Sequence, residues 1–353
     1  MRTLNGWTGG PVDRWTGLRI DVRVALGLVT ALGLVGTLAV AQTPRLTMTP
    51  SRPGGGTLTR LTIDRIAGHA DSVVSVVGEM AGEPLHFLDA GKGGDKLQAL
   101  GAIPVEVSDS VVANVVMTRA SGKSDTLRLK LPYPHQAPPP PAMGSRGRAP
   151  GARRLRVDPR FTARPDSATE ARVEHENELA REVGRKAQDT PALWEAPFAR
   201  PRSARVTSKF GSGRVFNGRV SSSHLGVDYR GALGDPIYAA NRGVVALVDT
   251  FFLAGNVVYI NHGNGLVTGY FHMSQPEVAI GDTVEKGQEI GKVGATGRVT
   301  GPHLHWSARF GALTIDPADL LSLGPPFVTA PAPAHGASNL SARKRSAARV
   351  AKR

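Results

Sequence analysis

The segment Gly301-Pro-His-Leu-His-Trp306 begins a predicted β-strand that runs from His303 to Phe310. Residues two apart on a strand point to the same face and lie about 6–7 Å apart along the chain. That spacing suits two tasks, in which one ring of His303 and His305 binds a metal ion and the other acts on a water molecule beside it. Spacing alone does not assign the two tasks. Leu304 points the opposite way, into a core.

A second segment, Ser223-His-Leu-Gly-Val-Asp228, supplies His224 and Asp228 as further candidate ligands. On a straight strand these two positions would be about 13 Å apart, so the segment must bend, and Gly226 permits a bend. The chain has no Cys, which excludes thiolate ligands and disulfides. Two histidines and one aspartate leave a fourth tetrahedral position for water. Such a zinc site lowers the pKa of the water and polarises a carbonyl.

Short β-strands separated by glycine turns dominate both halves of the chain, which predicts a mostly β protein. In the C-terminal half the expected strands are Gly243–Val248, Asn256–Asn261, Leu266–His272 and His303–Phe310. In the N-terminal half they are Leu58–Ile63, Ser72–Val77, Val105–Val107, Val111–Met117 and Asp125–Leu131, a spacing typical of a small β-sandwich. One helix is expected over residues 167–186, with Ser167 and Glu170 as its capping box.

The N-terminus has the pattern of a secretory signal. Arg14, Arg19 and Arg23 precede an uncharged apolar run from Val24 to Val40, which ends in Ala39-Val40-Ala41. We therefore expect export to the periplasm, the cell envelope or the extracellular space, with no stable membrane association once the signal is cleaved. An uncleaved membrane anchor remains the alternative, because the run is close to the length of a spanning helix.

The net charge of +14 comes mostly from two segments that look unfolded. Residues 145–165 and 328–353 each carry a net charge of +6. Only one aromatic residue, Phe161, lies within these basic segments, so we do not expect nucleic-acid binding. A polyanionic cell envelope would attract the tail by weak, salt-sensitive forces.

The stretch from Ser208 to Leu321 resembles the lysostaphin/LytM-type zinc endopeptidases that cut peptidoglycan. The matching motifs occur in order over roughly 115 residues. They are Ser208-Lys-Phe-Gly, His224-Leu-Gly-Val-Asp228, Asp235-Pro-Ile-Tyr-Ala, Gly255-Asn-Val-Val-Tyr-Ile-Asn-His-Gly-Asn-Gly, Tyr270-Phe-His-Met-Ser, Val278-Ala-Ile-Gly-Asp-Thr-Val-Glu-Lys-Gly-Gln, Gly294-Ala-Thr-Gly and Gly301-Pro-His-Leu-His-Trp.

The resemblance implies an antiparallel β-sheet or barrel-sandwich peptidase domain of the duplicated-hybrid-motif type. It implies that His224, Asp228 and His305 bind Zn2+. It also implies that His303 is the general base and that His272 stabilises the oxyanion. The expected function is hydrolysis of amide bonds in the peptide cross-links of peptidoglycan, with peptidoglycan as the partner. His262 belongs to a matching segment, but beside a Gly-Asn-Gly turn we expect it to fix local structure.

Two other functions compete with this one. Some members of this family have lost their zinc ligands and act as activators or scaffolds for other wall hydrolases, whereas here every expected catalytic position is filled. Residues 278–291 also resemble a stretch of biotinyl and lipoyl carrier domains. The hairpin Gly294-Ala-Thr-Gly, however, lacks the lysine that such a carrier would present.

The expected domain organisation has six parts. They are a signal peptide (1–41), a β-sandwich-like domain (42–132), a Pro/Arg-rich linker (133–165), a helix and connector (166–204), a zinc metallopeptidase domain (205–323) and a disordered basic tail (324–353).

Overall fold

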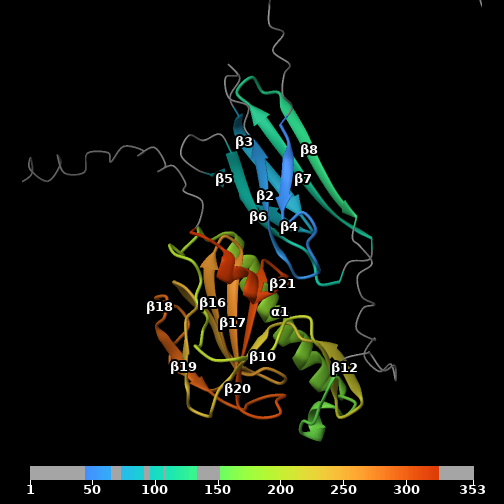
Figure 1. The fold of residues 1–353 in the computed structure, drawn as a ribbon, viewed down its shortest axis with the longest axis vertical. Helices are drawn as coiled ribbons and strands as arrows, with labels where there is room; N and C mark the ends of the chain where they lie inside the picture. The colour runs from blue at the N-terminus through green and yellow to red at the C-terminus, as the bar shows by residue number, and fades with distance from the viewer. Residues whose placement is uncertain (1–43, 65–72, 91–95, 107–108, 133–151, 326–353) are drawn as a thin grey trace, which may run out of the picture. The chain divides into compact units, whose positions relative to one another are not determined.

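A computed structural model describes residues 44–64, 73–90, 96–106, 109–132 and 152–325 of the chain (Figure 1). The predicted signal peptide, the proline run Pro138–Pro141 and the basic tail from residue 326 lie outside the described residues. Within the described ranges, no helix is long and apolar enough to cross a membrane.

The N-terminal strands form two four-stranded sheets, ordered β1-β2-β6-β5 and β4-β3-β7-β8. All strand pairings in these two sheets are antiparallel, as expected for a small sandwich. The strands are β1 (Leu46–Thr49), β2 (Leu58–Asp64), β3 (Val73–Met80), β4 (Glu83–Leu85), β5 (Leu88–Asp89), β6 (Lys96–Ala102), β7 (Ser110–Arg119) and β8 (Ser124–Pro132).

Alternation of side chains explains the sandwich core. In β7, Val111, Ala113, Val115 and Met117 are buried while the residues between them are more exposed, because successive strand residues point to opposite faces. One predicted strand is wrong. Residues 105–106 form a bend and are not in a strand, and the strand of this part of the chain is β6, which ends at Ala102, before Pro104.

A ten-stranded antiparallel sheet forms the C-terminal part, with the main order β10-β13-β20-β17-β16-β15-β18. Beside it lies a three-stranded sheet, β12-β11-β9. The strands are β9 (Arg153–Leu155), β10 (Val206–Ser208), β11 (Gly213–Phe216), β12 (Val220–Ser223), β13 (Val227–Arg230), β14 (Pro236–Tyr238), β15 (Gly243–Phe251), β16 (Gly255–Gly263), β17 (Leu266–Pro276), β18 (Thr283–Val284), β19 (Glu289–Val293), β20 (His303–Phe310) and β21 (Leu313–Ile315), with two 3-10 helices, η1 (Pro159–Phe161) and η2 (Pro317–Ser322).

The central strands of this sheet are covered on both faces. On β16, Val257 and Tyr259 pack into a cluster with α1 (Ser167–Gln188), whereas Val258 and Ile260 belong to the large core on the other face. Figure 1 shows the long strands β16, β17 and β20 running side by side. Burial on both faces explains why β16 carries the unbroken apolar run Val257–Ile260.

The helix begins at Ser167 as predicted, but its N-cap is the preceding residue. Asp166, not Ser167, is the N-cap residue, and its carboxylate accepts a hydrogen bond from the amide of Thr169 at 2.8 Å. Asp166 is extended and follows Pro165, which gives the geometry in which a side chain can reach the first free amides. The capping box of Ser167 and Glu170 is therefore a wrong prediction, although the helix itself is present.

The last part of the Arg-rich stretch is structured, against the expectation that it packs no core. Strand β9 pairs in parallel with β11, which places Arg153 opposite Arg214. Phe161 in η1 is only 7% exposed and packs against Phe252 with ring centroids 5.2 Å apart. Residues 152–165 thus contribute to the C-terminal fold, and composition alone hid this because the anchoring aromatic lies within a run of charged residues.

We expect Gly184→Ala to destabilise the fold by about 1–3 kcal/mol. Alanine within a helix normally stabilises relative to glycine by about 1 kcal/mol. Here a Cβ at residue 184 would lie 1.8 Å from the carbonyl oxygen of Gly311, so α1 would have to move. Chemical denaturation checks this, with Gly324→Ala as the control, because its added methyl would meet no atom within 4 Å. Equal stabilities for the two variants would contradict the packing described.

Candidate metal centre

The register of three neighbouring strands brings the candidate ligands together. Asp228 on β13 pairs with His305 on β20, and His305 pairs with Phe271 on β17. Directly opposite residues on antiparallel strands point to the same face. The rings of His305 and Phe271 stack at 5.1 Å with an interplanar angle of 11°, so the row is packed as well as aligned.

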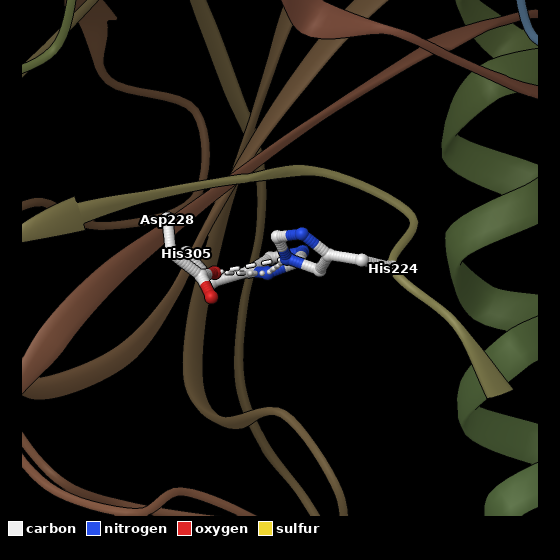
Figure 2. A group of neighbouring side chains, drawn as sticks. All are labelled: His224, Asp228 and His305. Atoms are coloured by element: carbon white, nitrogen blue, oxygen red, sulfur yellow. Dashed lines mark hydrogen bonds and ion pairs between the residues drawn. The ribbon is translucent and has the colours of Figure 1, made fainter. Parts of the chain in front are cut away.

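His224 completes the set from the segment between β12 and β13 (Figure 2). Its Nε2 lies 2.9 Å from His305 Nδ1 and 2.9 Å from Asp228 Oδ1, and the latter two atoms are 3.0 Å apart. All three residues are buried, with exposed fractions of 2%, 6% and 8% for His224, Asp228 and His305. Sequence reasoning selected these three residues, and the structure brings them together as a group able to hold a metal ion.

This donor set fits a zinc ion. Ligand atoms about 2.0–2.1 Å from one tetrahedral ion are separated by roughly 3.3 Å, a few tenths of an ångström more than the separations seen here. Two imidazole nitrogens and one carboxylate oxygen are donors that zinc accepts, and three protein ligands are the number found in catalytic sites. The three residues would therefore need only a small adjustment to bind the ion.

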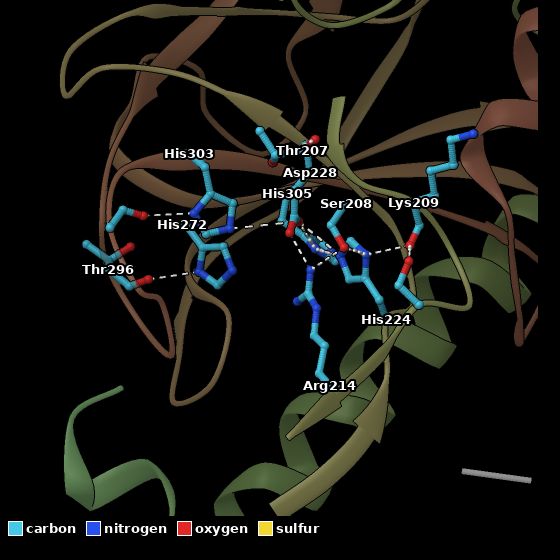
Figure 3. A network of polar contacts seen from close by, with 12 residues as sticks. Thr207, Ser208, Lys209, Arg214, His224, Asp228, His272, Thr296, His303 and His305 are labelled. Atoms are coloured by element: carbon cyan, nitrogen blue, oxygen red, sulfur yellow. Dashed lines mark hydrogen bonds and ion pairs between the residues drawn. The ribbon is translucent and has the colours of Figure 1, made fainter. Parts of the chain in front are cut away.

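Neighbouring groups hold two of the three ligands, His224 and Asp228, in orientation (Figure 3). His224 Nδ1 lies 2.9 Å from the carbonyl oxygen of Lys209, to which it donates, so that Nε2 faces the other two ligands. Arg214 donates to the second carboxylate oxygen of Asp228, Oδ2, and to Ser208 Oγ. Asp228 thus keeps Oδ1 for the cluster. Such partners fix ring tautomers and carboxylate orientation around a metal.

Burial controls the protonation of the site. It lowers the pKa of His305 to about 4, against the opposing effect of Asp228. It also lowers the pKa of His272 well below the ordinary value, with further contributions from His303 and His305. For Asp228, burial would raise the pKa, but the neighbouring rings of His224 and His305 outweigh it and lower the pKa. At neutral pH His305 is thus neutral and Asp228 ionised, as metal ligation requires.

The chain bends at Gly226 as expected, and lack of space is a further reason for a glycine at this position. Residues 224–226 do leave the strand between β12 and β13, but the backbone of Gly226 is not in the left-handed region. What excludes a side chain is space, since a Cβ here would lie 2.5 Å from His305 Nε2 and 2.6 Å from the carbonyl oxygen of Trp306.

His303 and His272 lie beside the three ligands, and in each ring Nδ1 is hydrogen-bonded to a backbone carbonyl while Nε2 is left free. His303 Nδ1 lies 2.8 Å from the carbonyl oxygen of Gly301, and His272 Nδ1 lies 2.8 Å from that of Thr296. A carbonyl oxygen only accepts, so each Nδ1 carries the proton and each neutral ring keeps a lone pair on Nε2. His303 Nε2 is 3.8 Å from Asp228 Oδ1. The ring centroids of His272 and His303 are 4.9 Å apart.

A β-bulge directs His272 toward the site. Between two regular pairs of β16 and β17, the single residue Val257 opposes both Phe271 and His272. His272 has φ of +60°, which is uncommon for a residue with a side chain. Bulges beside active sites re-aim side chains, and this one lets two consecutive residues serve the same site. The sequence motif contains His272 but carries no signal for the bulge.

The remaining histidines of the described chain are not part of the cluster. His262 is completely buried, with Nδ1 donating to the carbonyl oxygen of Arg242 at 2.7 Å and Nε2 2.8 Å from Thr268 Oγ. These contacts agree with the structural role expected for it. His175 is exposed on α1. Sequence reasoning missed Arg214 and Thr296, because their contacts form only when segments distant from the ligands fold against them.

Comparisons with known proteins identify the family of this domain. Residues 222–317 match the model of peptidase family M23. The peptidoglycan DD-endopeptidases ShyC and ShyA of Vibrio cholerae are 44% and 43% identical to this chain over 104 residues, which is 29% of this chain and 24% of each relative. The chain thus matches about a quarter of the length of these relatives.

The fold agrees with that of a known structure. The crystal structure of a Pseudomonas aeruginosa protein assigned to peptidase M23 superposes with a TM-score of 0.53, covering 76% of this chain and 95% of that one at 22% identity. This chain therefore contains a peptidase family M23 domain, and the resemblance to lysostaphin/LytM-type peptidases is confirmed at the level of that domain.

We expect Gly226→Ala to weaken zinc binding at least about tenfold, because the added methyl must displace His305 from its place beside Asp228. Competition with a chromogenic chelator measures this affinity. Gly301→Ala is the matched control, because it lies in the same region and its added methyl would meet nothing within 4 Å. Unchanged affinity in a folded Gly226→Ala protein would contradict the close approach.

Burial of His262 predicts loss of stability in acid. Burial lowers the pKa of His262 to about 4, below the ordinary value of about 6.5. Between pH 6.5 and 4, His262 is protonated in the unfolded chain but stays neutral in the folded chain. The free energy of unfolding should therefore decrease, by at most about 1.4 kcal/mol per pH unit for this residue, as the pH falls from about 6.5 to 4.

Denaturation at several pH values tests this effect. His262→Gln should reduce the steepness of the pH dependence near pH 5 by about one proton, whereas exposed His175→Gln should leave it unchanged. The same steepness in both variants would show that His262 is not the group responsible.

Proposed function

We propose that this chain is an exported zinc-dependent endopeptidase that hydrolyses amide bonds in the peptide cross-links of peptidoglycan. The observation that carries the proposal is the convergence of a buried three-donor cluster, formed by His224, Asp228 and His305, with two histidine Nε2 atoms beside it. The family match and the names of the two relatives support the reaction and the substrate.

Zinc bound by His224, Asp228 and His305 would supply Lewis acidity, which polarises the amide carbonyl and lowers the pKa of water. The chain's own residues handle the protons. His303 Nε2 has a free lone pair because Nδ1–H is donated to Gly301, so it can accept a proton from the attacking water. The water oxygen then bonds to the carbonyl carbon, the C–N bond breaks, and His303 returns the proton to the leaving amine.

His272 is proposed to stabilise the negative charge that develops on the carbonyl oxygen. Its neutral ring offers only a lone pair at Nε2, because Nδ1–H is donated to Thr296. It can therefore donate to the oxyanion only after Nε2 has taken a proton from solvent, since the proton of the attacking water passes through His303 to the leaving amine. The developing negative charge favours that protonation, which burial otherwise opposes.

The site of action is proposed from the N-terminal sequence. The signal-like pattern in residues 1–41 supports export to the periplasm or cell envelope, where peptidoglycan lies. Whether this segment is cleaved or kept as an anchor can be read from the N-terminus of the protein recovered from cells.

Digestion of purified peptidoglycan tests the function. Protein lacking residues 1–41 should release peptide fragments, identified by mass spectrometry, and a chelator should abolish the release until zinc is restored. Zinc-loaded protein that releases nothing would favour the alternative of an inactive activator of other wall hydrolases.

The two histidines of β20 should separate metal binding from turnover. We expect His303→Ala to retain zinc while turnover falls about 10²–10⁴-fold, the usual effect of losing a general base. His305→Ala should lose the zinc itself, because it removes a ligand. Zinc analysis and peptide release on the same samples measure both effects. Turnover of His303→Ala at the level of the unmodified protein would exclude His303 as the base.

A further inference from the structure

A pocket beside the ligand cluster is lined by four arginines. It has a volume of about 240 Å³ and includes Arg153, Arg214, Arg230 and Arg298 together with Asp228 and His303. Asp228 is the only acidic residue that lines it. The pocket therefore borders both a metal ligand, Asp228, and the proposed base, His303. Of its four arginines, Arg214 orients Asp228, and the other three have no such role.

The positive charges of this pocket are not balanced by the described part of the chain. Arg214 is paired with Asp228, whose other oxygen faces His224 and His305. Among the described residues, Arg153, Arg230 and Arg298 have no ion pair with a carboxylate. The guanidinium of Arg298 instead lies 4.2 Å from the centroid of the Phe216 ring.

The fold places these like charges close together. Arg153 on β9 is the register partner of Arg214 on the parallel strand β11, and two neighbouring positive charges repel each other. Burial lowers the pKa of Arg298 to about 10, and the charge of Arg214 adds to this shift. A bound anion would relieve the repulsion, because guanidinium groups bind carboxylates through paired, charge-assisted hydrogen bonds.

We propose that this arginine pocket binds a free carboxylate of the peptide substrate next to the scissile amide. The proposal rests on the proposed peptidase function and adds a specificity to it. A carboxylate held here would fix the peptide relative to His303 and the ligand cluster, since all of them border one pocket. Cross-links with a free carboxylate beside the scissile bond should then be cut in preference to those in which that group is amidated.

Two synthetic cross-linked peptides test the preference, identical except for a free carboxylate or a carboxamide at the residue next to the scissile bond. With the zinc-loaded full chain, we expect kcat/KM to be at least about tenfold higher for the carboxylate peptide. Equal values for the two peptides would overturn the proposal.

Variants of the pocket arginines test whether the pocket causes the preference for the carboxylate peptide. Arg153→Gln removes an exposed pocket arginine and should lower the preference several-fold, and the Arg153→Gln/Arg298→Gln double variant should bring it close to one. Arg154→Gln is the matched control, because Arg154 is exposed on the same strand but does not line the pocket, and it should keep the full preference. A preference that survives in the double variant would overturn the proposal. If the double variant does not fold because the contact between Arg298 and the Phe216 ring is lost, the single variant Arg153→Gln still tests the proposal.

A binding measurement separates this proposal from the peptidase proposal. If zinc-loaded protein cuts neither peptide, the peptidase function fails, and calorimetry with the same uncut peptides then tests the pocket alone. Binding of the carboxylate peptide at least tenfold tighter than the carboxamide, a preference reduced several-fold in Arg153→Gln and lost in the Arg153→Gln/Arg298→Gln double variant, supports the pocket. Equal affinities overturn it.

Discussion

The register of β13, β20 and β17 is the constraint on which the site depends. Asp228, His305 and Phe271 lie in one row across three strands, while Leu304 and Trp306, on either side of His305, are buried in the core of the opposite face. A shift of one residue would turn every side chain of β20 over. It would move His305 into the large core and remove Trp306 from it, so the energy that buries Trp306 in that core also keeps His305 at the site.

Rigidity follows from cover on both faces of the sheet. The cluster shared by α1, β16 and β17 lies on one face and the large core on the other, so β17, which pairs with the ligand strand β20, is packed on both faces. His224 lies outside a strand, and the carbonyl oxygen of Lys209 holds its ring in place. A site built on packed strands can keep three donors about 3 Å apart in an interior where their contact would otherwise be unfavourable.

Much of the fold and of the ligand set could be predicted from sequence, because both depend on local patterns. Alternation along β7 predicts a sandwich strand, and the spacing of His303 and His305 predicts a shared face. Other features depend on contacts between distant segments. The bulge at His272 needs Val257 opposite it, and Phe161 is buried only because Phe252 meets it. The N-cap was misplaced by one residue because Asp166 and Ser167 are both capping residue types and only backbone geometry distinguishes them.

Strand β9 and helix α1 show that the unit able to fold is larger than the region that carries the family's motifs. The matched residues, 222–317, contain the ligands, but β9 pairs with β11, and α1 covers Val257, Tyr259 and Val267. A fragment that starts at residue 205 would expose that apolar surface to water and leave the edge of β11 open to other chains. Such a fragment would aggregate, so the boundary for expressing the peptidase alone belongs before residue 152.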